Sequence, residues 1–196
     1  MKGYLRFLVV GLILGLFLEA ELKLVAGIRP ATFVYTLFAY PIIISLSYLG
    51  SRLLDRIFSS RWKGDIIHYA GTAFFGLMVE WFLLGNGLGS NAFQLGMVAM
   101  WTTFCFGPRI LTRSGLEGSS PYRKFWRAYV VVGFLVTAGI LLVSGTAAKT
   151  VIAVVSLSAT YIVWSISLLV MAWHSRYSLQ VVSGSRSVDF PHNFSG

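Results

Sequence analysis

The stretch FGLMVEWFLLGNG, residues 75–87, is an apolar run interrupted by one carboxylate, that of Glu80. It belongs to an apolar segment at residues 66–84. This segment has the length of a membrane-spanning helix, because a hydrocarbon layer of about 30 Å takes roughly 20 residues. Five similar segments occur along the chain, at residues 4–26, 30–50, 91–108, 126–144 and 150–173. The sequence therefore predicts an all-α, polytopic transmembrane bundle of about six spans.

The composition leads to the same class. Of the 196 residues, 56% are hydrophobic and 12% are charged, whereas soluble domains have about 45–50% apolar and about 25% charged residues. Six spans use nearly the whole chain, so no length remains for a separate soluble domain. We expect residues 1–176 to form one transmembrane domain and residues 177–196 to form a short polar tail on the cytoplasmic surface.

The basic residues predict the orientation of the spans. Lys and Arg are enriched in the cytoplasmic loops of membrane proteins. Under six crossings, one side of the membrane receives thirteen of the sixteen basic residues, namely Lys2, Arg6, Arg52, Arg56, Arg61, Lys63, Arg109, Arg113, Arg123, Lys124, Arg127, Arg176 and Arg186. The other side receives Lys23, Arg29 and Lys149. This split predicts an integral membrane protein with both termini in the cytoplasm.

The net charge of +9 and the single cysteine limit the partners and the chemistry. In a membrane protein, excess positive charge serves topology and contact with anionic headgroups. We therefore expect membrane lipids as partners and a bound lipid, and no nucleic acid, because there is no separate basic domain to bind it. Cys105 alone cannot form a disulfide within one chain, which excludes a dithiol redox mechanism.

Two glutamates are predicted to lie at similar depth in the outer half of the membrane. Glu80 follows the inner end of its span by about fifteen residues, or roughly 20 Å at 1.5 Å per residue, and Glu19 has nearly the same depth. Small residues precede each glutamate at one-turn spacing, which places them on the same helix face: Gly11 and Gly15 before Glu19, and Thr72 and Gly76 before Glu80. Small residues at this spacing favour close helix packing, so both carboxylates should face protein.

Other polar residues at this depth extend the predicted site. They are Asn86, Asn91 and Gln94, which together with the two glutamates form a candidate site for a ligand or a proton. Two carboxylates close together in a low dielectric either share a proton or hold a cation or a basic side chain between them. The structural alternative is a Glu19–Lys23 ion pair at one-turn spacing. Glu21, closer to the interface, is expected to be solvated.

The histidines offer little evidence for a metal or a cofactor. His68 lies on the same side of its span as Glu80, so it either ends a proton path or hydrogen-bonds a neighbouring helix. His68, His174 and His192 lack the spacing of a zinc site or a di-iron box, and a haem between His68 and His174 is only a weak alternative. We expect no metal.

The longest connecting segment is strongly basic. It contains Arg109, Arg113, Arg123 and Lys124, which are candidates to bind a lipid headgroup through its phosphate. Topology alone also explains this charge.

Three functions follow from these features, and no catalytic residue is identified. The first is an accessory, structural or solute-binding subunit of a membrane complex, with an outer-leaflet carboxylate cluster. The second is a small proton- or cation-coupled transporter, and the third is an intramembrane enzyme acting on a lipid or isoprenoid. Six spans in 196 residues leave loops too short for gates of any size. This favours the first function and predicts other membrane subunits or self-association as partners.

Overall fold

The computed structural model describes residues 2–26, 31–83, 91–114, 116–143 and 146–185. Within these ranges the chain is all helical, with six α-helices and one π-helical turn. They are α1 (Lys2–Ala26), α2 (Ala31–Ile57), α3 (Arg61–Met78) continued by η1 (Val79–Leu83), α4 (Asn91–Leu111), α5 (Ser120–Leu141) and α6 (Thr146–Ser185). Each predicted apolar segment corresponds to one helix, so the all-α prediction is confirmed.

Within the described ranges, three helical segments are long and apolar enough to cross a membrane. They are Thr36–Ile57 in α2, Ser120–Leu141 in α5 and Lys149–Ser175 in α6. Their outer faces carry large apolar side chains such as Phe38 and Phe134, which are 71% and 68% exposed. Contiguous apolar surface of this kind marks a membrane or protein contact, which is consistent with membrane association.

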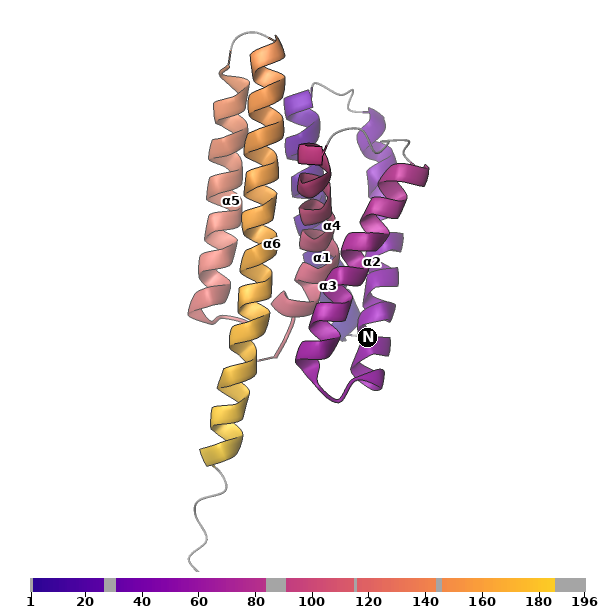
Figure 1. Cartoon of the computed structure of the whole chain (residues 1–196), viewed down its shortest axis with the longest axis vertical. Helices are drawn as coiled ribbons and strands as arrows, with labels where there is room; N and C mark the ends of the chain where they lie inside the picture. The colour runs from indigo at the N-terminus through magenta and orange to yellow at the C-terminus, as the bar shows by residue number, and fades with distance from the viewer. Residues whose placement is uncertain (1, 27–30, 84–90, 115, 144–145, 186–196) are drawn as a thin grey trace, which may run out of the picture.

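Helix α4 occupies the centre of the bundle, where α1, α2, α3 and α6 pack around it (Figure 1). Its residues from Met97 to Leu111 are buried almost without interruption. A helix that is apolar on all sides is expected in the interior, and α4 has this character. Helices α5 and α6 lie side by side and form one flank of the bundle.

The helices alternate in direction, so the basic connecting segments meet at one end of the bundle (Figure 1). We name this the basic end and the opposite one the far end. At the basic end Arg6 of α1 forms an ion pair of 3.0 Å with Glu117, between α4 and α5. Helix α6 continues past this end to Ser185. Part of the predicted polar tail is therefore helical, and residues 186–196 lie outside the described part.

The three glycines predicted for helix packing lie at close helix contacts, and Thr72 is buried. A Cβ atom on Gly11 or Gly15 would lie 2.7 Å from Ile44 or Tyr40 of α2. A Cβ atom on Gly76 would overlap Trp101 of α4. Thr72 is buried, and its hydroxyl donates to the carbonyl of Tyr69.

We expect Gly76→Leu to destabilise the protein, because the new side chain would displace the Trp101 ring. Overpacking of this kind costs about 1–3 kcal/mol in the free energy of unfolding. Gly71→Leu is the matched control, because Gly71 lies on the same helix with open space at its Cβ position. The measurement is thermal unfolding in detergent. Equal midpoints for the two variants would contradict the α3–α4 contact.

Candidate functional site

A buried ionic network lies at the basic end and is centred on Asp65 of α3. The Asp65 side chain is only 1% exposed. Its carboxylate accepts a hydrogen bond of 2.8 Å from Nε of Arg109 and bonds of 2.7 and 2.8 Å from Nη2 of Arg113. The two arginines are four residues apart on α4, so they share one helix face and reach the same carboxylate.

The remaining donors of the arginines join two further helices to this network. Nη1 of Arg109 donates to the carbonyl and to the hydroxyl of Ser51 on α2, at 2.9 and 2.5 Å. Its Nη2 donates to Asp55 of α2 at 2.7 Å. Nη1 of Arg113 donates to the hydroxyl of Ser175 on α6 at 2.8 Å. Four helices therefore meet through two guanidinium groups.

Sequence reasoning missed both aspartates of this network, although one signal pointed to Asp65. The buried face of α3 consists of Gly64, Asp65, His68, Thr72 and Gly76, and η1 continues this face to Glu80. Extending the stripe that identified Glu80 toward the start of the helix would have reached Asp65. Gly64 also contributes, because a Cβ atom there would lie 3.1 Å from Nη2 of Arg109.

A cavity of about 530 Å³ opens beside this network. Most of its lining is polar, including Ser51, Arg52, Asp55, Arg61, Arg109 and Arg113. Arg52 and Arg61 are exposed, and neither has an ion-pair partner among the described residues. Four guanidinium groups face only Asp55 and the underlying Asp65, so the cavity has an excess of positive charge and suits an anion.

His68 is held inside the bundle near this network. Its Nε2 lies 3.1 Å from both the hydroxyl and the carbonyl oxygen of Ser47 on α2. The ring also lies against Phe106 of α4, with centroids 6.0 Å apart. Within the described part of the chain, no group of three His, Cys, Asp or Glu residues could hold a metal ion.

Glu19 at the far end is satisfied by its neighbours. Its carboxylate forms an ion pair of 3.0 Å with Lys23, one turn along α1. It also accepts hydrogen bonds from the hydroxyls of Tyr40 and Thr36 on α2, at 2.9 and 3.3 Å. The structure thus contains the ion pair that the sequence offered as the structural alternative.

Glu80 lies in η1 and is 4% exposed. Nε1 of Trp101 donates to its carboxylate at 2.9 Å, and Gly76 provides the space for the Trp101 ring. Phe104 packs between Trp101 and Tyr40, with ring centroids 5.0 and 4.7 Å away. The rings of Trp101, Phe104 and Tyr40 therefore form one row. Trp101 at one end of this row donates to Glu80, and Tyr40 at the other end donates to Glu19.

The expectation that Glu21 is solvated is wrong. Glu21 is 3% exposed because α5 packs over it, and Gly133 of α5 leaves room for its carboxylate. The hydroxyl of Thr137 donates to Oε1 at 3.3 Å, while Oε2 has no hydrogen-bond partner in the part of the chain that the structure describes.

The other predicted far-end residues are only partly placed. Gln94 is half-buried, and its Nε2 has no hydrogen-bond partner among the described residues. Asn86 and the side chain of Asn91 lie outside the described part.

The predicted headgroup cluster is divided between two places. Arg109 and Arg113 point into the bundle and bond to aspartates, whereas Arg123 and Lys124 are exposed on α5. Lys124 lines a separate groove between α5 and α6. The four residues therefore do not form one phosphate cradle.

Comparisons with protein-family models, curated protein sequences and solved structures gave no match to this chain. A functional proposal must therefore rest on the geometry of the chain itself.

We expect Asp65→Asn to destabilise the protein strongly, because it leaves two buried guanidinium groups without their shared carboxylate. Removing one partner of a buried ion pair costs about 3–5 kcal/mol. Asp55→Asn is the matched control, since the Asp55 side chain is 46% exposed and an exposed pair contributes at most about 1 kcal/mol. Chemical denaturation in detergent measures the free energy of unfolding of both variants. A smaller loss for Asp65→Asn than for Asp55→Asn would contradict the central role of Asp65.

Proposed function

We propose that the chain is an integral membrane protein of six spans with both termini in the cytoplasm. Beyond the three candidate spans, α1 has 25 residues, α3 with η1 has 23, and α4 has 21. At 1.5 Å per residue these lengths are about 37, 35 and 32 Å, enough for a hydrocarbon layer of about 30 Å. The excess of Lys and Arg at the basic end supports a cytoplasmic location for that end.

We further propose that the protein is a solute-binding subunit of a membrane complex, and that the cavity at the basic end binds a phosphate-bearing ligand. The observation that carries this proposal is the set of four arginines around one cavity of about 530 Å³. Guanidinium groups match phosphate oxygens in charge and in geometry, often through two parallel hydrogen bonds. Pockets of about 300–1,000 Å³ are typical of small-molecule sites.

The arginines divide into two pairs with different roles in this proposal. Asp65, Asp55 and neighbouring serines fix Arg109 and Arg113, which form an ordered floor whose charge the two aspartates balance. Arg52 and Arg61 lie at the exposed mouth, and both are available to contact the ligand. An ordered floor lowers the entropic cost of binding, and the exposed rim allows the ligand to enter from the cytoplasm.

The transporter and enzyme alternatives have less support from the geometry. Lys23, Tyr40 and Thr36 already satisfy Glu19, and Trp101 donates to Glu80. His68 is engaged with Ser47. The intramembrane ionisable groups named in those alternatives therefore contribute to contacts between helices, as buried polar groups in membranes often do.

We expect inorganic phosphate to raise the thermal unfolding midpoint of the purified protein. A ligand that binds only the folded state adds about 2.7 kcal/mol to stability at one hundred times its dissociation constant. The double variant Arg52→Gln/Arg61→Gln should lose this effect. Arg56→Gln/Lys63→Gln is the matched control, because both residues are exposed on the same helices and neither lines the cavity.

Chloride at equal ionic strength separates specific binding from screening. A second arm replaces phosphate with a short-chain phosphatidic acid, which distinguishes a free phosphate compound from a lipid headgroup. A phosphate effect that persists in Arg52→Gln/Arg61→Gln would contradict the site. The absence of an effect from both probes would contradict the proposed ligand class.

The subunit role predicts co-purification with other polypeptides. Helix α6 has 40 residues and continues past the basic end to Ser185, and we propose that this extension contacts a partner chain. Native mass spectrometry after gentle extraction should show other chains in a fixed ratio. Deleting residues 177–196 should release them and leave the phosphate response intact. A chain that emerges alone or as a homo-oligomer would contradict the subunit role.

A further inference from the structure

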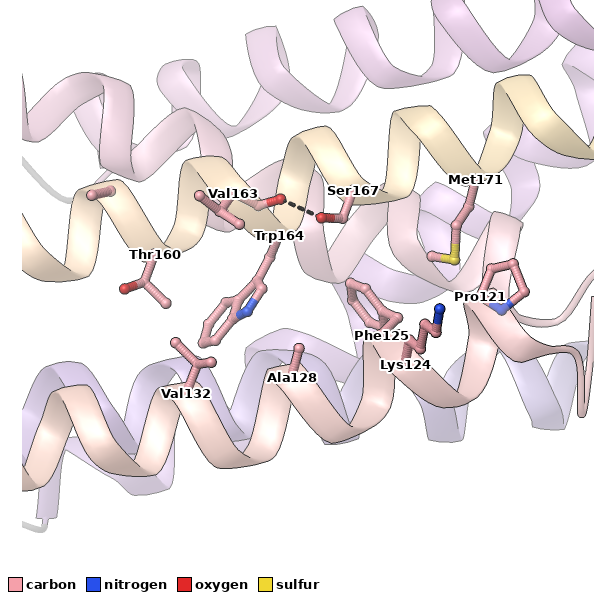
Figure 2. Close-up of a pocket in the computed structure, with 11 residues that line it drawn as sticks. Pro121, Lys124, Phe125, Ala128, Val132, Thr160, Val163, Trp164, Ser167 and Met171 are labelled. Atoms are coloured by element: carbon pink, nitrogen blue, oxygen red, sulfur yellow. Dashed lines mark hydrogen bonds between the residues drawn. The ribbon is translucent and has the colours of Figure 1, made fainter.

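A groove of about 420 Å³ lies between α5 and α6, away from the cavity at the basic end (Figure 2). Its floor consists of Phe125, Trp164 and Met171, which are buried. Its walls include Val132 and Val163, which are 41% and 59% exposed. Both helices are among the segments long and apolar enough to cross a membrane, so in a bilayer the opening of the groove faces lipid.

The groove can accept only an apolar occupant along most of its length. The hydroxyl of Ser167 donates to the carbonyl of Val163, and the hydroxyl of Thr160 donates to that of Ser156, each at 2.7 Å. Neither hydroxyl therefore needs a partner in the groove. Ala128 and Ala159 contribute small side chains to the lining, which keeps the space open.

One end of the groove is positively charged. Lys124 and Pro121 lie there, as Figure 2 shows, and they belong to the first turns of α5. Within the described residues, Lys124 has no ion-pair partner. The start of a helix also carries a partial positive charge. An anion at this end would be attracted by the charge of Lys124 and by the partial charge at the start of α5.

We propose that this groove binds one anionic phospholipid, with its phosphate at Lys124 and one acyl chain along Ala128 and Val132. The span from Lys124 to Val132 is eight residues, or about 12 Å along the helix, enough for part of an acyl chain. The charge at one end and the apolar remainder match the two parts of this lipid. This groove is separate from the proposed phosphate-binding cavity, whose arginines lie on other helices.

Native mass spectrometry of the full chain in detergent tests the charged end. The probes are phosphatidylglycerol and phosphatidylcholine with the same acyl chains. We expect preferential retention of phosphatidylglycerol, reduced about fivefold by Lys124→Gln, which is the factor for one basic residue near an anionic surface. Arg127→Gln is the matched control on the same helix, because Arg127 does not line the groove. Equal losses for the two variants, or equal retention of the two lipids, would overturn the proposal.

Ala128→Leu tests the apolar part. The added side chain occupies the groove without entering the core, since Ala128 is exposed, and it should reduce retention of phosphatidylglycerol. Val131→Leu is the control, because Val131 is exposed on the same helix outside the groove. Unchanged lipid retention in Ala128→Leu would overturn the acyl-chain assignment.

Loss of a bound polypeptide instead of a lipid would overturn the lipid assignment and show that the groove holds a partner helix. Arg52→Gln/Arg61→Gln should retain the lipid, which separates this site from the cavity.

Discussion

The carboxylate of Asp65 is the group on which the basic end of the bundle depends. An ionised side chain away from water is stable only when it is paired and hydrogen-bonded, and Asp65 meets this condition through Arg109 and Arg113. The same two arginines reach Ser51 and Asp55 on α2 and Ser175 on α6. One buried carboxylate thus joins four helices, because both arginines that bind it on α4 also bond to α2 or α6.

This arrangement also explains how the bundle keeps a positively charged cavity at one end. Asp65 and Asp55 balance the charges of Arg109 and Arg113 and hold both side chains in place. The excess positive charge of the cavity comes from Arg52 and Arg61 at its mouth. The network therefore shapes the floor of the proposed phosphate site, while Arg52 and Arg61 supply its charge.

The number and order of the helices were predictable from the sequence, because each membrane-length apolar run produces one helix regardless of its partners. The close packing of Gly15 and Gly76 was predictable for a similar reason, since one-turn spacing alone defines a helix face. Side-chain pairing was harder to predict, because it depends on which helices become neighbours. The apolar segment was expected to end at Pro108, with Arg109 in the following loop, but α4 continues to Leu111. Arg109 therefore lies on the helix and bonds to Asp65 inside the bundle.

Contacts between helices that are distant in the sequence also explain why Glu21 is buried and how the α5–α6 pair is held in the bundle. The hydroxyl of Tyr129 on α5 donates to the carbonyl of Leu14 at 2.7 Å, and that of Tyr161 on α6 donates to the carbonyl of Leu18 at 3.4 Å. These bonds hold the inner face of the pair against α1 and bury Glu21 beneath Thr137. Among the described residues, the hydrogen bonds from this pair to α1 all lie on the inner face. The outer face between α5 and α6 can therefore remain open to a lipid without weakening the contact that holds the pair in the bundle.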